Sequence, residues 1–431
     1  MSDVVVISGG VDGLVAGYLL AGGGRRVTVV LEQDLPAGTP GWVPPPVARK
    51  LGIELTVRRP DPWLRAPLPG GGALELWQDM QRSVESLRRI SPHDAGKWPE
   101  FSERMARLGA LLERIYVGPP PSLVDTSFAL RVRRLGRRGM EDLMRTLPMP
   151  AAELLDDWFE SDVLKGALGA LAVADLQQGV RSAGTAFRLL HFHAGSPPGV
   201  FRAPSSNLGV LLRGRSGVTV RSGKAARIAV SAGRVTGVIL DGGEELAAGT
   251  VVSDAAPGRT LLDLVEPGWL DPDLARAVGH IRSRPVAARM RLELERAPEW
   301  PTLTLAPSLD YVERAYDAVK YRRASAQPVI DAVADGAAVD VVVQYVPDET
   351  AVSLAPLEPH LPLITRQTVQ YGQPHQAELA LDQALWMRPL PELARYRTPI
   401  GGLWLCGQAM HPGASVAGAS GYNCARAILR A

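Results

Sequence analysis

Six residues near the N-terminus have the composition of a dinucleotide-binding turn. The chain reads Ser8-Gly9-Gly10-Val11-Asp12-Gly13 directly after an apolar run at residues 4–7. Glycines in such a turn permit a tight bend, let the backbone approach a pyrophosphate, and let the helix pack closely on the strand. Glu32 follows 19 residues after Gly13, where a carboxylate can accept the ribose hydroxyls. The spacing predicts a nucleotide site, and a strand–helix–strand unit without a ligand remains the alternative.

The elements around this turn predict a parallel sheet. Residues 4–7 and 27–31 are continuous β-branched and aliphatic runs, which are typical of strands buried on both faces. Residues 14–20 are apolar with small residues between them, as in a helix packed on a sheet, and glycines at 22–24 end that helix. This order of elements indicates an α/β fold.

The remaining chain alternates between helical and strand-rich regions. Residues 43–200 predict helices separated by proline-rich turns, one of them capped by Ser91 with Pro92 at its first position. Residues 218–220, 225–230 and 235–240 predict a β-meander, and residues 250–253 predict a strand that returns to the first sheet. Residues 284–384 predict a second sheet with one buried face. A buried strand at 403–406 and a helix at 418–430 complete the chain.

Composition excludes several classes of protein. The 431 residues are 46% hydrophobic, so the chain has the material for a large core. With 47 basic and 45 acidic residues there is no net field for nucleic acid, and two cysteines exclude a disulfide scaffold. We expect neither a secretory signal nor a membrane span, which indicates a cytoplasmic protein. The basic run from Arg131 to Arg138 is either a solvated helix face or a site of peripheral membrane contact.

Motifs along the whole length carry a family resemblance. They are the opening turn with Gly13-Leu14-Val15-Ala16, the stretch Leu154 to Ser161, Val252-Ser253-Asp254-Ala255, Met387-Arg388-Pro389, Tyr396-Arg397-Thr398-Pro399, Gly402 to Gly407, and His411-Pro412-Gly413. The chain resembles the phytoene desaturase-like branch of the flavin amine oxidase superfamily. Within it, the chain is similar to the proteins named pyridine nucleotide-disulfide oxidoreductase domain proteins.

The resemblance implies a Rossmann-like FAD-binding domain of the glutathione reductase type with an inserted β-meander, and an α+β substrate domain. The FAD-binding domain would comprise residues 1–60, 200–265 and 385–431, and the substrate domain residues 61–199 and 266–384. FAD would accept a hydride from an apolar small molecule such as a polyene or a secondary metabolite, in a desaturase or amine-oxidase-like reaction. The implied cofactor-binding residues are Ser8, Gly9, Gly10, Asp12, Gly13, Glu32, Ala225 at the adenine, and Gly407, Gly413, Ala414, Ser415 and Val416 near the flavin.

The sequence departs from this family at several expected cofactor contacts. Ser8 replaces the first glycine of the turn, Ser205 and Ser206 stand where the family has a glycine pair, and Ala414 and Ser415 replace another pair. The segment after Glu32 is also shortened, to residues 34–39. Each added Cβ disfavours a close approach or a positive φ. Either FAD binds with adjusted loops, or the fold has lost redox function and catalyses a redox-neutral isomerisation or cyclisation of an apolar intermediate.

Histidines and cysteines supply the other chemical candidates. His411 precedes Pro412-Gly413 and is a candidate acid/base group, with a structural hydrogen bond as the alternative. His191 and His193 have the spacing of two residues on one face of a strand. No third ligand stands nearby at ligand spacing, so packed histidines and no metal site are expected. Cys406 and Cys424 have no redox spacing and are expected to be buried. The sequence leaves the oligomeric state open.

Overall fold

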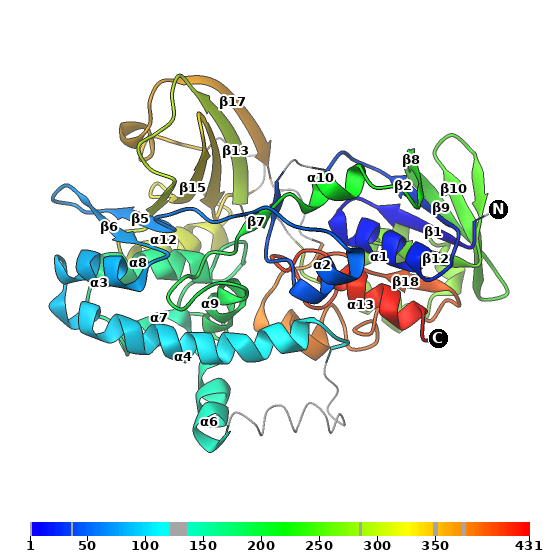
Figure 1. The fold of residues 1–431 in the computed structure, drawn as a ribbon, viewed down its shortest axis with the longest axis horizontal. Coiled ribbons are helices and arrows are strands. Elements are labelled where there is room, and N and C mark those ends of the chain that lie inside the picture. The colour runs from blue at the N-terminus through cyan, green and yellow to red at the C-terminus, as the bar shows by residue number, and fades with distance from the viewer. Residues whose placement is uncertain (1, 36–37, 121–135, 284–286, 348–351, 372–375) are drawn as a thin grey trace.

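The computed structural model describes residues 2–35, 38–120, 136–283, 287–347, 352–371 and 376–431. The prediction of an α/β fold with a parallel sheet is confirmed (Figure 1). Five parallel strands lie in the order β18-β12-β1-β2-β8. Their bounds are Leu403–Leu405 for β18, Thr250–Ser253 for β12, Val4–Ser8 for β1, Val27–Leu31 for β2 and Thr219–Ser222 for β8.

The central strand of this sheet is buried between other parts of the chain, which explains its continuous apolar sequence. Every residue of β1 is buried, as a strand covered on both faces requires. Helix α1 (Val11–Gly22) packs against one face, and the C-terminal helix α13 (Ala419–Ile428) packs on α1. The two helices approach so closely that a Cβ at Gly421 would overlap the carbonyl oxygen of Asp12. The beginning and the end of the described chain therefore share one core, which also includes strands β12 and β18.

One strand of the predicted β-meander belongs to a different sheet. The meander consists of β9 (Ala225–Ser231), β10 (Arg234–Leu240) and β11 (Glu245–Ala247). The expected first strand, near residues 218–220, is β8, which pairs in parallel with β2. Strand β12 pairs with β1, so the prediction that it returns to the first sheet is confirmed. Periodicity could not separate these cases because β8 is short and exposed at all four residues.

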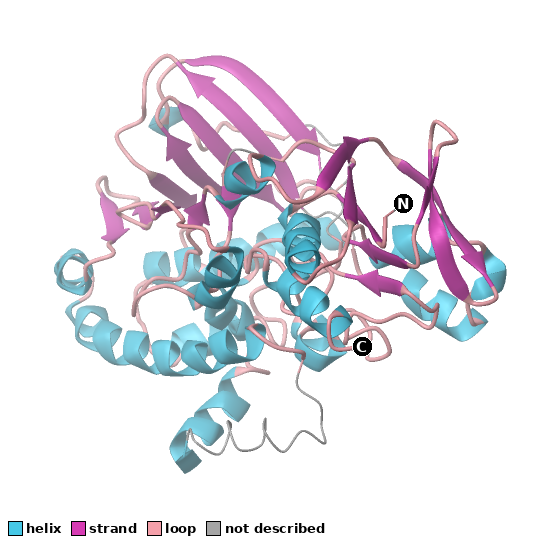
Figure 2. Ribbon diagram, turned by 45° about the vertical axis from the view of Figure 1, so that its right-hand side comes forward, coloured by secondary structure: helices cyan, strands magenta, loops and turns pink. Residues whose placement is uncertain are grey.

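A second, antiparallel sheet lies beside a helical layer (Figure 2). Its order is β14-β15-β16-β13-β17. The bounds are Thr302–Leu305 for β14, Val329–Asp335 for β15, Ala338–Gln344 for β16, Ala287–Leu294 for β13 and Ile364–Tyr371 for β17. Burial alternates along β13, with Met290, Leu292 and Leu294 inside, as the sequence predicted. The sheet contacts helices α8 (Asp162–Ala172) and α12 (Leu309–Lys320).

The other helices lie mainly between residues 45 and 280. Their bounds are Pro45–Leu51 for α2, Met80–Arg88 for α3, Pro92–Tyr116 for α4, Gly136–Thr146 for α6, Ala151–Asp156 for α7, Ala186–His193 for α9, Leu208–Arg213 for α10 and Pro272–Gly279 for α11. Ser91 caps α4 as predicted, because its side chain accepts a hydrogen bond from the amide of Asp94. A π-helical turn, η1, spans Arg259–Asp263.

Several short strands form two further small sheets. They are β3 (Thr39–Pro40), β7 (Ser205–Ser206) and β4 (Val57–Arg58) in one sheet, and β5 (Leu64–Pro67) with β6 (Ala73–Leu76) in a hairpin. Among the described residues no helix is long and apolar enough to cross a membrane. Residues 131–135 of the basic run lie outside the described residues, so peripheral membrane contact stays a prediction. The domain boundaries proposed from the sequence also stay a prediction.

Candidate functional site

The glycine turn forms the junction between β1 and α1, as the sequence predicted. Ser8 is the last residue of β1, and Gly10 is the N-cap of α1, whose start has no side-chain cap. A Cβ at Gly13 would lie 2.5 Å from the hydroxyl oxygen of Ser8. A glycine is therefore required at position 13 for the helix to pack on the strand.

A carboxylate of the chain itself binds this turn. Asp254 follows β12 and accepts hydrogen bonds from the amides of Gly9 and Gly13, each at 2.8 Å. The Ser8 hydroxyl lies 2.9 Å from the Gly10 carbonyl oxygen and 3.2 Å from Asp254. Asp254 is 1% exposed, and this burial raises the pKa of its carboxyl. Two amides at the turn that is expected to face a pyrophosphate are thus directed at an internal anion.

Glu32 binds two groups of the chain rather than facing free space. Its Oε1 atom accepts hydrogen bonds from the Ala225 amide at 2.9 Å and from Arg259 Nη2 at 2.8 Å. The other guanidinium nitrogen of Arg259 pairs with Oε2. Glu32 and Ala225 were predicted to contact different parts of one cofactor, the ribose and the adenine. Here they bind each other directly.

Asp12 connects the turn to the C-terminal helix. Its Oδ1 atom accepts a hydrogen bond from the Gly421 amide in the first turn of α13, at 3.2 Å. The side chain is buried, and desolvation raises the pKa of its carboxyl from 3.8 to about 7. The amides of α13 and the positive end of its dipole favour the charged form, which limits this rise. Asp12 therefore holds α1 against α13.

The loop before α13 approaches another part of the chain. The amide of Trp42 donates to the Ser415 carbonyl at 2.9 Å, and the amide of Ala417 donates to the Trp42 carbonyl at 2.8 Å. These bonds form a parallel bridge between Trp42 and Val416. Gly41 lies so close that a Cβ there would come within 2.9 Å of the Ser415 backbone. Residues predicted to border the flavin are therefore bridged to residues 41–42.

Three of the predicted flavin-contacting residues have a positive φ. Gly407 and Gly413 have φ values of 89° and 107°, and Ser415 has a φ of 68°. The other substituted positions, Ser8, Ser205, Ser206 and Ala414, do not have a positive φ. The expected conformational cost of replacing glycine therefore falls on Ser415.

Arg388 supports the same loop from inside the protein. Its guanidinium donates to the carbonyls of five residues, which are Ala377, Glu378, Gln383, Gln408 and Met410. Burial lowers the pKa of this side chain to about 9, so it stays charged at neutral pH. A charged donor that serves five acceptors fixes the path of the chain ahead of Gly413.

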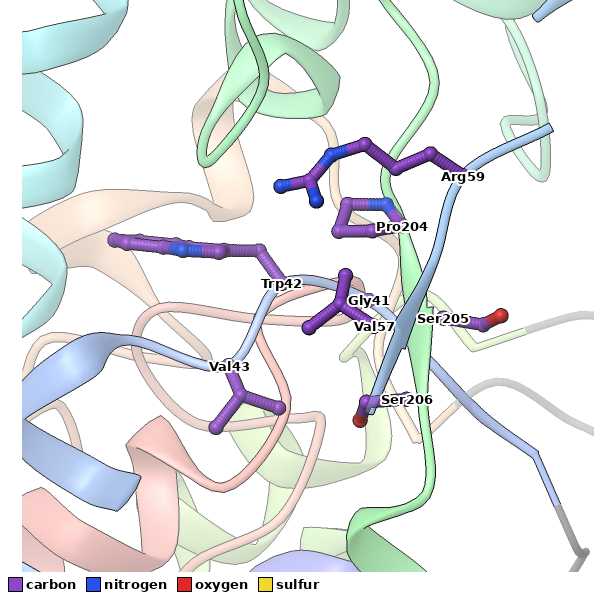
Figure 3. A pocket seen from close by; sticks show the side chains of 8 residues that line it. All are labelled: Gly41, Trp42, Val43, Val57, Arg59, Pro204, Ser205 and Ser206. Atoms are coloured by element: carbon purple, nitrogen blue, oxygen red, sulfur yellow. The ribbon is translucent and has the colours of Figure 1, made fainter. Parts of the chain in front are cut away.

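The space beside residues 205 and 206 is small. A pocket of about 100 Å³ is lined by Gly41, Trp42, Val43, Val57, Arg59, Pro204, Ser205 and Ser206 (Figure 3). Sites for small molecules occupy roughly 300–1,000 Å³. The direct bond from Ala225 to Glu32 and the bridge at Trp42 use groups that were predicted to contact the cofactor, so these residues do not fit FAD as they are arranged.

His411 is enclosed in the core. Its Nε2 atom donates to the Ile115 carbonyl at 3.2 Å, and its Nδ1 atom is buried without a hydrogen-bond partner. Burial lowers the pKa of the ring to about 4, so the imidazole is neutral at pH 7. The structure places His411 in a structural hydrogen bond, and its acid/base role stays a prediction.

The prediction that His191 and His193 lie on a strand is wrong, because both belong to helix α9. The Nε2 atom of His191 donates to the Ala414 carbonyl at 2.6 Å, so its Nδ1 atom accepts from the Tyr116 hydroxyl at 2.7 Å. Burial lowers the pKa of His191 to about 3. Among the described residues no group of three potential ligands could hold a metal ion. His191 instead anchors the loop that contains Ala414.

Three residues of this site were missed as candidates in the sequence. Asp254 had a usable signal, because it follows a strand predicted to lie beside β1, which brings its carboxylate to the turn. Arg259 comes five residues later, but its pairing with Glu32 depends on the tertiary structure. Trp42 had no local signal, since a backbone bridge to a segment more than 370 residues away leaves no pattern in composition.

Comparisons with known proteins place the fold. No protein-family model matches the chain. Pyridine nucleotide-disulfide oxidoreductase domain-containing protein 2 of Rattus norvegicus is 25% identical and aligns with 99% of this chain and 93% of its own length. A limonene dehydrogenase polypeptide of Castellaniella defragrans is 35% identical over 121 residues, which are 23% of this chain and 22% of that protein.

Solved structures agree with these relatives. Putrescine oxidase bound to putrescine has a TM-score of 0.60 at 12% identity, covering 100% of this chain and 98% of its own. Cyclohexylamine oxidase of Brevibacterium oxydans has a TM-score of 0.54 at 15% identity, covering 100% and 99%. The chain has the fold of the FAD-binding amine oxidases. The predicted fold class is confirmed, and the more specific likeness to phytoene desaturases stays a prediction.

Ser415→Gly should stabilise the protein, because glycine adopts a positive φ without the steric cost that serine carries. We expect the free energy of unfolding to rise by roughly 0.5–1 kcal/mol. Ala414→Gly is the matched control at a position without positive φ, and it should lower stability by a similar amount. Chemical denaturation measures both variants. Equal effects of the two substitutions would contradict the assignment of strain to Ser415.

Asp12→Asn should change how stability depends on pH. The folded pKa of about 7 lies above the value of 3.8 for a free carboxyl, so the folded state favours the protonated form. The contribution of Asp12 is therefore complete below pH 4 and is lost as pH rises to 7 and beyond. We expect the variant to gain stability relative to wild type between pH 4 and 8, by up to about 4 kcal/mol. A constant difference across this range in denaturation curves would refute the shift.

Proposed function

We propose that this chain binds and converts an apolar small molecule on the FAD-dependent oxidoreductase fold, without bound FAD. The observation that carries the proposal is the 2.9 Å hydrogen bond from the Ala225 amide to Glu32. It joins two groups that would otherwise contact different parts of the nucleotide. The conversion that we propose is redox-neutral, an isomerisation or a cyclisation in which bonds rearrange within the substrate.

Such a reaction depends on how the protein holds its substrate. Fixing a flexible molecule in one reactive conformation contributes several kcal/mol, up to roughly 7–11 kcal/mol in well-oriented cases. This route needs neither an oxidant nor a reductant. It is also consistent with a fold that supports unrelated chemistries, because function belongs to the site and not to the scaffold.

A partly open apolar pocket, smaller than the roughly 300–1,000 Å³ of typical small-molecule sites, agrees with the binding of part of an apolar substrate. About 250 Å³ of space lies between the β5–β6 hairpin and β14, and its walls include Leu68, Leu305 and Tyr311. The Tyr311 hydroxyl donates to the Pro328 carbonyl, so its polar group is already paired. The remaining lining comes from residues 66–69 and 304–307 and from Pro356. The relative from Castellaniella defragrans carries the name of an apolar hydrocarbon, limonene, which agrees with such a ligand.

An FAD-dependent oxidoreductase is the second candidate function. It is favoured by the glycine turn between β1 and α1 and by a relative, named for an oxidoreductase domain, that aligns with 99% of the chain. If FAD bound, it would supply hydride acceptance from a C–C or C–N bond. For that to occur, the contacts of Glu32 and Trp42 would first have to open.

Purifying the protein from cells supplied with riboflavin and then incubating it with FAD distinguishes the two candidate functions. We expect a colourless protein that retains no FAD after incubation with the cofactor and desalting, because contacts within the chain use Glu32, Ala225 and the loop at Ser415. Flavin released by denaturation is measured by chromatography, with putrescine oxidase as the positive control. Stoichiometric FAD that an apolar substrate reduces would establish the second candidate instead.

Leu305→Asp should weaken the binding of an apolar ligand. A carboxylate at this half-buried position in the wall of the pocket makes apolar contact unfavourable, and we expect limonene, used as a probe, to bind at least about tenfold more weakly. Leu363→Asp is the matched control, since Leu363 is 69% exposed and does not line the pocket. Isothermal titration calorimetry measures both variants. Unchanged binding in Leu305→Asp would place the ligand elsewhere.

A further inference from the structure

We infer that contacts within the chain take over the structural role of FAD, joining segments that the cofactor joins in a dinucleotide-binding fold. This inference rests on the proposed absence of FAD. Three sets of contacts carry it, at the ribose-binding carboxylate, at the glycine turn and at the start of the last helix. We call them the joint contacts. Each links segments that are distant in the sequence and close in the fold.

The first joint contact centres on Glu32, whose side chain is 8% exposed. It links the end of β2 to the first residue of β9 through the Ala225 amide and to η1 through Arg259. The guanidinium neutralises the carboxylate and contacts both of its oxygens. These three hydrogen bonds take most of the roughly four acceptor sites of the carboxylate, which in a dinucleotide-binding fold would accept ribose hydroxyls.

The second joint contact is Asp254 at the glycine turn. A carboxylate that accepts bonds from two turn amides resembles a phosphate held at a helix N-terminus, because both are anions fixed by backbone N–H groups. The Asp254 backbone is held as well. Its carbonyl accepts from Gln376, and a Cβ at Gly407 would lie 2.6 Å from the same carbonyl oxygen. Asp254 thereby connects the N-terminal turn to β12 and to the loop after β18.

The third joint contact is the bridge from Trp42 to the loop before α13. Besides the two backbone bonds to Ser415 and Ala417, the amide of Gly41 donates to the Pro204 carbonyl at 2.8 Å. The indole of Trp42, seen edge-on, extends away from Ser205 and Ser206 (Figure 3). It packs so closely on Gly195 that a Cβ there would overlap the ring. The ring thus anchors the segment on one side while its backbone binds the C-terminal loop on the other.

The contacts of Trp42 and its neighbours require glycine at two positions of the sequence. Gly41 has a φ of 107°, and its Cα faces the Ser415 backbone with no room for a side chain. Gly195 has a φ of 77° and leaves the space that the Trp42 ring fills. Both glycines serve contacts within the chain and neither belongs to the nucleotide-binding turn. We infer that the joint contacts and FAD compete for the same groups, which are the Glu32 carboxylate, the Ala225 amide and the amides of the glycine turn.

The test weakens two joint contacts and asks whether FAD replaces them. The double variant Arg259→Ala, Trp42→Ala removes the guanidinium partner of Glu32 and the ring that anchors the 41–43 segment, while the backbone bonds of Ala225 and Trp42 remain. The matched control is Arg227→Ala, Trp269→Ala. Arg227 forms an exposed ion pair with Glu266, and Trp269 is 37% exposed. Thermal unfolding with and without excess FAD is measured for wild type and both variants, and quenching of flavin fluorescence measures binding directly.

We expect the double variant to unfold at a lower temperature than wild type and to regain about 2 °C or more when FAD is added. Wild type and the control should show neither a shift nor quenching. The single variant Arg259→Ala, which keeps the Trp42 bridge, gives a second measurement if the double variant does not fold. It should show a weaker but detectable quenching of flavin fluorescence.

Two results would overturn the inference, and they differ in meaning. Folded variants that ignore FAD, beside a wild type that also ignores it, would show that the joint contacts do not occupy cofactor positions, while the proposed function stands. An equal FAD shift in wild type and in the double variant would overturn both the inference and the proposed absence of FAD.

Discussion

A carboxylate placed where three segments meet needs a partner for its charge, and in this protein the chain itself supplies that partner. Glu32 is held at the end of β2 by the parallel sheet, next to the first residue of β9 and to η1. A nucleotide would supply hydroxyl donors at this point. Here N–H groups of Arg259 and the Ala225 backbone are the donors instead. Because the carboxylate is nearly buried, leaving it unpaired would be costly. Asp254 and Trp42 likewise bind other segments of the chain.

The same principle governs the other buried charges around the sheet. Asp254 is satisfied by amides of the glycine turn, Asp12 by the start of α13, and Arg388 by five backbone carbonyls. Each of these side chains joins segments from different parts of the chain. Desolvation raises the pKa of both carboxyls and lowers that of the guanidinium, so burial opposes charge at every one of these sites. The hydrogen bonds compensate for that cost.

The fold of this molecule does not by itself determine its function. The parallel sheet, the β-meander and the last helix form the architecture of FAD-binding amine oxidases, and the likeness extends over the whole chain. That likeness is 12–15% in sequence identity and describes the scaffold. At the residues predicted to contact FAD, Trp42 is bridged to Val416 and the Ala225 amide binds Glu32.

The sequence by itself determined the local parts of this structure. Strands β1 and β2, the glycine turn and the cap at Ser91 follow from hydrophobic runs and from backbone preferences within a few residues. The replacement of glycines at five positions was also visible there, and it pointed to an altered cofactor site. Only the tertiary structure decided what fills that site. Trp42 meets Ser415, and Arg259 meets Glu32, across 373 and 227 positions of the chain. Contacts over such separations depend on how the sheet brings its strands together, and no local pattern encodes them.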